Sequence, residues 1–275
     1  MDGASSRMSF ADVLTRYARE ASDFKPSAIW ENRRINWLKT QPFTRKAIGD
    51  LTPEDLATWR DSRLGEVASS TVGRDMNLIS AVLHKARREW GLIDKSPLTD
   101  VSRPRQPQAR HRRPTVAEMQ AMRFVAGDDL STINGRVYLA FEFACETAMR
   151  AGEIAGLTGE HVSFGRRVAH LPKTKNGSAR DVPLSSRAVE MLQTLPDQER
   201  LFNVTAGQIS SNFAKIRKRA SVAGLTFHDS RREGTSRLAK KLHVLELARV
   251  TGHKDLKMLM IYFEESAEEL ARKLD

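Results

Sequence analysis

A segment rich in proline and arginine near the middle of the chain limits what this sequence can fold into. Residues 101–114 (VSRPRQPQARHRRP) hold three prolines, five arginines and no acidic residue. Proline interrupts helices and central strands, and a run of like charges opposes burial. The 275-residue chain is therefore expected to form two domains, at residues 1–100 and 115–275, joined by an extended basic linker over residues 101–114.

The charge of the whole chain indicates the kind of partner. Its formal net charge is +11, and the linker contributes five arginines to this excess. Such an excess favours a polyanion, most simply nucleic acid, so we expect the linker to lie on phosphate groups. The alternatives are a linker that is only solvated and a protein that is only basic.

Cysteine usage and hydropathy bear on the compartment. Cys145 is the only cysteine, so no intrachain disulfide can form, and the apolar run over residues 138–145 favours a packed core thiol. The sequence has no run of about 18 apolar residues, and no apolar signal core follows residues 1–7. We therefore expect a cytoplasmic, nucleoid-associated protein of bacterial or phage character, with no membrane partner.

Apolar periodicity predicts helices throughout residues 9–100. Ser9 is expected to cap the first helix, Pro26 to lie in the first turn of the second, and Thr52 to precede the third. The clearest apolar stripe has spacings that alternate between four and three, and Gly91 is expected to end that helix. The stripe consists of Val72, Met76, Ile79, Leu83, Ala86 and Trp90.

Basic residues on this helix and in the linker are the candidate DNA contacts. A solvated face is the ordinary explanation for such charges, but a basic helical domain tied to a basic linker also suits a DNA groove. The candidates are Lys85, Arg87, Arg88, Arg103, Arg105, Arg110, Arg112 and Arg113.

The second domain also begins with helical signals. Thr115 and Glu118 form a capping box that opens a helix, and residues 135–149 are apolar enough for a buried helix. Another capping box, Thr205 with Gln208, starts a remainder that is helical.

Between these helices the period changes to that of strands. Residues 162–164, 167–171 and 180–184 predict short strands, with turns at 165–166 and 175–177. The expected fold class is therefore mainly α with a small antiparallel β-sheet.

Several residues of the second domain are suited to chemistry on a phosphodiester. Tyr262 follows His253 by nine residues. A tyrosine can attack the phosphorus atom if cations surround the phosphate and a proton donor serves the leaving oxygen. Taken singly, each candidate has a structural explanation as an ion pair, a turn, a cap or a packed aromatic. The candidates are Arg150, Lys175, His228, Arg231, His253 and Tyr262.

Metal and nucleotide chemistry are not indicated. The two candidate histidines are far apart in sequence, and neither HExxH nor CxxC spacing occurs. The phosphate-binding pattern GxxxxGK[ST] is also absent. We therefore expect no cofactor.

Four sequence boxes in order resemble the tyrosine recombinase family, also called phage integrases. ETAMRAGEI, which contains Arg150, resembles the first arginine box, and Lys175, eight residues before Pro183, resembles the β-hairpin lysine. His228-Asp229-x-Arg231 resembles the second box, and Thr251-Gly252-His253 followed by Tyr262 resembles the third. The resemblance extends from about residue 9 to residue 275, and VAHLP with TKNG is most similar to shufflon-type invertases and related phage integrases.

The chain departs from the family pattern at two positions. Ser230 stands where the family usually has leucine, and Arg232 stands where it usually has histidine. Neither is a catalytic position, although either change could reduce packing or activity. Because the first helical domain begins almost at residue 1, we also expect the chain to lack the further N-terminal domain of larger phage integrases.

The resemblance implies a two-domain clamp around duplex DNA that cleaves and rejoins strands through a 3′-phosphotyrosyl intermediate, to integrate, excise or invert DNA. Arg150 and Arg231 would bind the nonbridging oxygens of the phosphate, and Lys175 would protonate the departing 5′ oxygen. His228 would assist proton transfer at the tyrosine. His253 would hydrogen-bond the phosphate, and Tyr262 would be the nucleophile.

The resemblance also implies an assembly. A homo-tetramer on two DNA sites would form through the C-terminal helix, and an accessory DNA-bending protein could take part. The apolar face of that helix is expected at Phe263, Ala267, Leu270, Ala271 and Leu274, with packing in cis as the alternative. Other functions stay open: strand relaxation like that of a type IB topoisomerase, a catalytically idle DNA-binding protein, and a structural interaction module.

Overall fold

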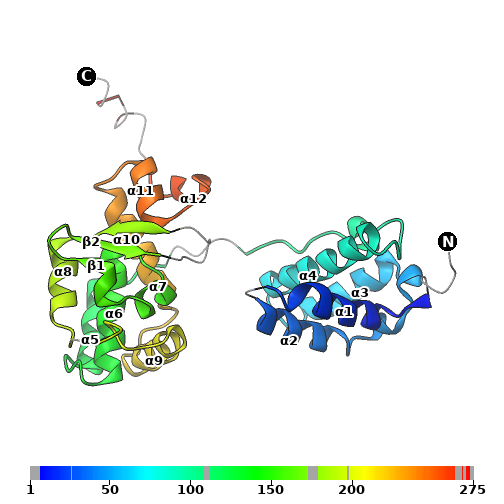
Figure 1. The fold of residues 1–275 in the computed structure, drawn as a ribbon, viewed down its shortest axis with the longest axis horizontal. Coiled ribbons are helices and arrows are strands. Elements are labelled where there is room, and N and C mark those ends of the chain that lie inside the picture. Colours follow the sequence, from blue (N-terminus) through cyan, green and yellow to red (C-terminus); the bar gives the residue numbers. More distant parts are fainter. Residues whose placement is uncertain are drawn as a thin grey trace. The chain divides into compact units, whose positions relative to one another are not determined.

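The computed structural model divides the chain into two compact units, Met1–Ala109 and Arg110–Asp275, each drawn in Figure 1. The structure describes residues 7–25, 27–107, 112–172, 179–196, 198–263, 268, 271 and 272. The boundary lies inside the predicted linker, and each unit buries its own apolar cluster. Six residues named above lie outside the described residues: Pro26, Arg110, Lys175, Ala267, Leu270 and Leu274.

Unit 1 is helical because local capping signals begin its helices and apolar stripes bury them. The Ser9 hydroxyl accepts a hydrogen bond from the Asp12 amide at 3.1 Å, and Thr52 forms a capping box with Asp55. Both predicted caps are confirmed. The elements are α1 Phe10–Tyr17, the π-helix η2 Ala18–Ser22, α2 Ala28–Leu38, η3 Pro42–Arg45, η4 Ile48–Asp50, α3 Pro53–Leu64, α4 Ser69–Arg88 and η5 Pro97–Asp100.

The predicted stripe of α4 is buried, with one correction at its end. The helix stops at Arg88, so Trp90 lies beyond it and is only half-buried. Its amide still bonds the Lys85 carbonyl, at 3.3 Å, because the chain leaves the helix gradually. Gly91 takes a φ of 60°, the left-handed conformation that glycine adopts most readily, so the predicted glycine turn is present, but the helix itself ends earlier, at Arg88.

Unit 2 is built around α6, an apolar helix whose predicted position at residues 135–149 is confirmed within two residues. It begins at Ile133 and ends at Thr147, where Ala148 adopts a left-handed φ of 54°. The elements are α5 Val116–Ala126, α6 Ile133–Thr147, α7 Ala151–Ala155, η6 Gly159–His161, β1 Val162–Ser163, β2 Val168–Leu171, β3 Arg180–Pro183, α8 Ser186–Gln193, α9 Ala206–Arg219, α10 His228–Ala239, α11 Val244–Thr251 and α12 Lys257–Met260.

Within the described residues, the strands form one antiparallel sheet in the order β1-β2-β3. Ala169 of β2 pairs with Val162 of β1 on one side and with Val182 of β3 on the other, and all three side chains are buried. The predicted strands were slightly too long, because Arg167, at a φ of 53°, belongs to the turn before β2. The predicted fold class, mainly α with a small antiparallel sheet, is confirmed.

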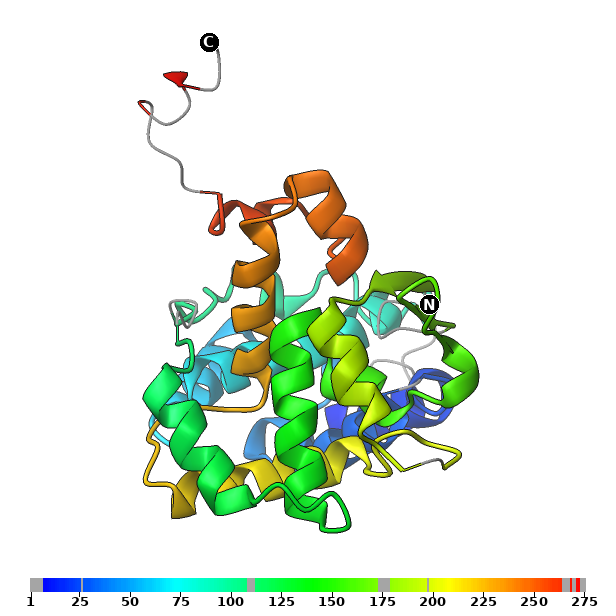
Figure 2. The ribbon, with the colours of Figure 1, turned by 90° about the vertical axis from the view of Figure 1, so that its left-hand side faces the viewer.

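A glycine allows α10 to lie close against the end of α6. A Cβ atom on Gly234 would lie 2.7 Å from the Ala144 oxygen and 2.8 Å from the Ala148 nitrogen, both in the backbone. Figure 2 shows α6, in green, beside α10, in orange. This close approach brings the first turn of α10 to the left-handed residue that follows α6.

Candidate active site

Arg231, on the first turn of α10, ties together the ends of two other helices. Its buried guanidinium donates hydrogen bonds to the Ala148 carbonyl at 2.5 Å and the Thr251 carbonyl at 2.7 Å. These carbonyls lie at the C-terminal ends of α6 and α11, where unpaired helix carbonyls carry partial negative charge. They therefore stabilise a buried cation without neutralising it.

Arg150 lies at the N-terminal end of α7 and is held by Glu153. The Arg150 amide donates to Glu153 Oε2 at 2.8 Å, and its Nη1 donates to Oε1 at 2.9 Å. The side chain keeps 21% of its surface exposed, whereas that of Glu153 keeps 5%. The bracing contact between the two residues fixes one side of the Arg150 guanidinium and leaves part of it accessible.

Arg180, the first residue of β3, is a member of the cluster that the sequence did not reveal. Its Nη1 and Nη2 donate to the two oxygens of Glu153 at 2.8 and 2.7 Å, and its Nε donates to the Val250 carbonyl at 2.9 Å. Burial by itself would raise the pKa of Glu153. The hydrogen bonds from Arg180 and Arg150 outweigh burial and lower that pKa to about 2. The carboxylate is therefore ionised throughout the neutral range.

The two predicted histidines lie beside these arginines, and both are neutral near pH 7. Burial first, and then the charges of Arg231 and Arg150, lower the pKa of His253 to about 4. His228 keeps an exposed edge at the start of α10, yet desolvation by the surrounding protein, followed by the charge of Arg231, lowers its pKa.

A hydrogen bond to Thr251 fixes the tautomer of His253. The Thr251 hydroxyl lies 2.6 Å from the Leu247 carbonyl and 2.6 Å from His253 Nδ1. Because its single proton goes to the carbonyl, the hydroxyl accepts from Nδ1–H. The Nε2 atom of the neutral ring is then an acceptor, which becomes a donor only when the ring is protonated.

Tyr262 lies just after α12 and is half-buried. Burial raises the pKa of its phenol, although the charges of Arg232, Arg231 and Arg113 act in the opposite direction. Of these arginines, Arg231 belongs to the cluster around Glu153. The phenol is neutral at pH 7, so a base must take its proton before it can act as a nucleophile.

The other two tyrosines are placed for structural roles. Tyr17 is 4% exposed in unit 1, and Tyr138 is 3% exposed in unit 2. Their hydroxyl groups bond Lys25 at 2.9 Å and the Met119 carbonyl at 2.7 Å. Both are core residues, as their apolar sequence surroundings predict.

The cluster is suited to an anion. It has three guanidinium groups and one carboxylate: Arg150 and Arg180 bond Glu153, and Arg231 is influenced by the charge of Glu153 without a hydrogen bond to it. Burial first, and then the neighbouring charge of Arg150, lower the pKa of Arg231 to about 9, so both effects oppose its charged form. A phosphate group would favour that charged form.

Lys175 cannot be placed against this cluster, because residues 173–178 lie outside the described residues. The strands on either side of them are described: β2 ends at Leu171 and β3 begins at Arg180. A hollow of about 400 Å³ beside the start of β3 is lined by Arg180, Gly252 and His253 among others.

The predicted DNA contacts are divided between the two units: those from Lys85 to Arg105 belong to unit 1, and those from Arg110 to Arg113 belong to unit 2. Lys85 pairs with Glu89 and Arg103 donates to Asn77 at 2.8 Å, whereas Arg87, Arg88 and Arg105 are exposed. In the linker, Arg112 pairs with Glu118, and Arg113 donates to Glu233 on α10 at 2.7 Å. Arg110 lies outside the described residues.

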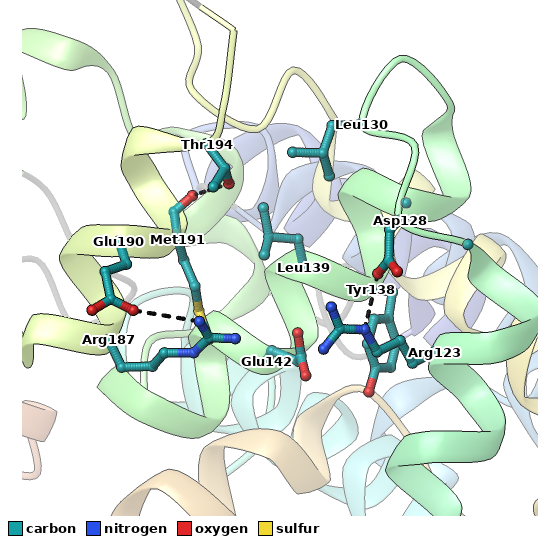
Figure 3. Close-up of a pocket in the computed structure, with 12 residues that line it drawn as sticks. Arg123, Asp128, Leu130, Tyr138, Leu139, Glu142, Arg187, Glu190, Met191 and Thr194 are labelled. Atoms are coloured by element: carbon teal, nitrogen blue, oxygen red, sulfur yellow. Dashed lines mark hydrogen bonds and ion pairs between the residues drawn. The ribbon is translucent and has the colours of Figure 1, made fainter.

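A separate pocket of about 250 Å³ between α5, α6 and α8 contains none of the predicted site residues. Figure 3 shows Glu142 between Arg123 and Arg187, with Arg123 paired to Asp128 and Arg187 to Glu190. Burial raises the pKa of Glu142 against the influence of the two arginines. Its mixed charges make it a poorer anion site than the cluster around Arg231.

Two further observations concern only the described part of the chain. No helix there combines the length and apolar content needed to cross a membrane. No three His, Cys, Asp or Glu side chains there are grouped to hold a metal ion.

Comparisons with known proteins agree with the sequence boxes. Residues 115–269 match the phage integrase family. The chain is 36% identical over 273 residues to a putative integrase/recombinase of Haemophilus influenzae, covering 97% of this chain and 90% of that protein. It is 35% identical over 282 residues to the shufflon-specific DNA recombinase of Escherichia coli, covering 98% of this chain and 72% of that protein. Among solved structures, the lambda integrase in a tetramer bound to a Holliday junction has a similar fold, with a TM-score of 0.79 at 18% identity, covering 94% of this chain and 79% of that one.

Proposed function

Because the chain belongs to the phage integrase family of tyrosine recombinases, we propose that it is a site-specific DNA recombinase acting on double-stranded DNA. The observation that carries this proposal is the convergence of Arg150, His228, Arg231, His253 and Tyr262 in one basic cluster. Similarity to the shufflon-specific DNA recombinase of Escherichia coli adds support. Cleavage and rejoining of strands would integrate, excise or invert the DNA between two sites.

The arginines would hold the scissile phosphate. Arg150 is partly accessible and Arg231 is fixed by backbone carbonyls, so both are preorganised for the nonbridging oxygens. The charge that gathers on these oxygens in the pentavalent transition state would meet cations already in position. The anion would also raise the pKa of His253, so that its Nε2 becomes a hydrogen-bond donor to the phosphate.

The covalent step exchanges one phosphodiester for another. The Tyr262 oxygen bonds to phosphorus, the bond from phosphorus to the 5′ oxygen breaks, and the 3′ end stays on the tyrosine. His228 would take the phenol proton, and Lys175 would supply a proton to the 5′ oxygen. A 5′ hydroxyl of the partner strand then reverses the step. The phosphotyrosyl bond conserves the phosphodiester energy, so joining needs no ATP.

The assembly is proposed to be a tetramer on two DNA sites. The lambda integrase tetramer bound to a Holliday junction has a similar fold. Around α11 and α12, the apolar residues Leu245, Leu256, Met258, Met260 and Ile261 are exposed, which suits docking of a neighbouring copy's C-terminal segment. A cytoplasmic, nucleoid-associated location and an accessory DNA-bending protein would be consistent with this activity.

The test is covalent trapping on a nicked, end-labelled site drawn from repeats near the gene. Tyr262→Phe removes one oxygen and should bind DNA as tightly as the wild type while forming no adduct that resists SDS. Tyr17→Phe, which removes a hydroxyl in unit 1, is the matched control and should form the adduct normally. An adduct from Tyr262→Phe would overturn the assignment of the nucleophile.

A second assay separates recombination from simple strand relaxation. A supercoiled plasmid without a recombination site should stay supercoiled, and a plasmid with two sites should give recombinant products. Relaxation of the plasmid without sites would favour an activity like that of a type IB topoisomerase.

A further inference from the structure

We propose that Arg180 is a positioning residue that acts on Arg150 through the carboxylate of Glu153. The inference rests on the proposed recombinase activity, because that proposal makes Arg150 a ligand of the DNA phosphate. Arg180 lies within the hairpin segment between Lys175 and Pro183, but it is none of the predicted catalytic positions. The contacts of Arg180 are the evidence for its positioning role.

The contact between Arg180 and Glu153 is a two-point, buried ion pair. Two guanidinium nitrogens meet two carboxylate oxygens at 2.8 and 2.7 Å, and the side chains are 8% and 5% exposed. A planar fork facing a planar carboxylate fixes the rotation of both groups, which a single-point contact cannot do. The plane of the Glu153 carboxylate is therefore set by β3.

That carboxylate in turn orients Arg150. Its Oε1 accepts from Arg150 Nη1 and its Oε2 accepts from the Arg150 amide, so both oxygens are shared between the two arginines. If Arg180 were absent, the full negative charge of Glu153 would face Arg150 alone. The carboxylate would then compete with the DNA phosphate for the Arg150 guanidinium. With Arg180 present, the pair is neutral and Arg150 keeps its charge for the substrate.

The same side chain reaches the turn that carries His253. Arg180 Nε donates to the Val250 carbonyl at 2.9 Å, in the last turn of α11. A Cβ atom at Gly252 would lie 3.2 Å from Arg180 Cδ and 3.3 Å from its Nη1, and the Gly252 φ is 70°. Glycine at this position therefore serves both the left-handed end of α11 and the space for the guanidinium. One arginine thus joins β3, α7 and α11.

The decisive measurement is single-turnover cleavage of a nicked site by Arg180→Met, which keeps an unbranched side chain and removes the guanidinium fork. The rate constant should fall about a hundredfold, the scale of a misplaced catalytic group. The dissociation constant for the site should change little. Arg187→Met, at an exposed arginine of the same unit that pairs with Glu190 at 3.4 Å, is the matched control and should cleave normally.

A double-mutant cycle with Glu153→Gln tests whether Arg180 acts through the carboxylate. In the Glu153→Gln background, adding Arg180→Met should slow cleavage by less than about threefold, because the charge to be neutralised is already gone. An effect as large as in the wild-type background would overturn the proposal. A merely structural loss would lower the fraction of enzyme that cleaves and leave the rate constant of the remainder unchanged.

Arg180→Lys keeps the charge but removes the two-point contact and the Nε–H bond to the Val250 carbonyl, so it also serves if Arg180→Met does not fold. It should cleave at least tenfold more slowly than the wild type. Cleavage at the wild-type rate would show that the fork is not needed. If the wild-type protein itself forms no adduct, the proposed function fails; an active wild type with an equally active Arg180→Met contradicts only the role of Arg180.

Discussion

Single residues of the site sit in an unfavourable field until an anion arrives. Among the described residues, no carboxylate is in direct contact with Arg231, whose hydrogen bonds go to the carbonyls of Ala148 and Thr251. Burial and the nearby Arg150 lower its pKa to about 9. The neutral state of His253 follows from burial first and then from the charges of Arg231 and Arg150. In the proposed reaction, a DNA phosphate would favour the charged forms of both groups.

The depressed pKa of His253 predicts how stability depends on pH. In the unfolded chain the ring takes up a proton below its ordinary pKa of 6.5, whereas the folded ring does so only near 4. The unfolded state thus binds more protons in this window, so the free energy of unfolding should fall as pH is lowered from 6.5 toward 4. His253→Asn should reduce this slope, measured by urea unfolding between pH 6.5 and 4.5.

The experiment stops at pH 4.5 so that the titration of Glu153 does not contribute to the slope. The pKa of Glu153 is also lowered, from 4.5 to about 2, so its contribution to stability is lost only below pH 4.5. His84→Asn, at an exposed histidine of α4, is the control. Equal slopes in the wild type and His253→Asn would mean that the ring does not titrate in the expected window.

Lys175 is predicted to act on the leaving group and not on binding. Lys175→Ala should slow cleavage about a hundredfold or more, the usual range for lost acid catalysis. A substrate with a 5′-bridging sulfur, whose leaving group needs no proton, should recover most of that rate. The measurement is single-turnover cleavage of both substrates; a sulfur substrate slowed just as much would assign Lys175 to positioning the phosphate.

At the scale of elements, the close contact between α6 and α10 holds the site in shape. Gly234→Ala would bring a methyl group against backbone atoms of Ala144 and Ala148, which a rotamer change cannot relieve. The expected loss of stability is about 1–3 kcal/mol. Cleavage should also slow, because α10 would carry Arg231 away from the Ala148 carbonyl.

The control for this prediction is another helical glycine with space around it. At Gly207, in the first turn of α9, the nearest atom to a new Cβ would be the Thr205 hydroxyl at 3.9 Å. Gly207→Ala should be neutral or stabilising by up to about 1 kcal/mol. Thermal unfolding of both variants decides the matter, and a Gly234→Ala protein as stable as the wild type would refute the packing argument.

The linker is expected to exchange its intramolecular partners for phosphate. Arg112 and Arg113 are bound to Glu118 and Glu233 in the absence of DNA. Changing Arg110, Arg112 and Arg113 to alanine should flatten the plot of log K against log salt by roughly one to three units. The affinity for specific DNA and the affinity for nonspecific DNA should fall by about the same factor. An unchanged slope, with Arg187→Ala as the control, would mean that the linker does not touch phosphate.

Elements with local signals could be predicted, and contacts between distant elements could not. The helix starts at Ser9, Thr115 and Thr205 follow from side chains that cap amides three positions away. The partner of Arg180 lies 27 positions earlier, and no local pattern records it. The one sequence signal for Arg180 was the strand period, which places Arg180 on the same face of β3 as the buried Val182.

The candidate site shows the same division. The predicted arginines, the histidines and Tyr262 could be identified only because their spacing as a set resembles a family. Each residue taken singly has a structural explanation. Folding explains why they converge, through the left-handed turn at Ala148 and the carbonyl of Thr251. Neither of these backbone groups has a side-chain signature, so the support around Arg231 was beyond reach of sequence patterns.

For the whole molecule, the proposed assembly depends on the C-terminal segment. The C-terminal segment was expected to present an apolar face, and of its described members Phe263 is half-buried and Ala271 is exposed. The exposed apolar residues of α11 and α12, Leu245, Met258 and Met260 among them, offer a surface of the same character. An exposed apolar surface next to an apolar segment favours docking between neighbouring copies.

Deleting residues 265–275 should therefore leave binding to a single DNA site intact and abolish complexes that pair two sites. The reason is that each copy would lose the segment it lends to its neighbour, while the basic linker and the arginine cluster of that copy remain. Native gel electrophoresis with one labelled and one unlabelled site measures both properties at the same protein concentration. Arg272→Ala, which changes an exposed charge and no apolar residue of that segment, is the control and should still pair sites. If the truncated protein forms paired complexes at full yield, the segment packs in cis and the copies must join through another surface.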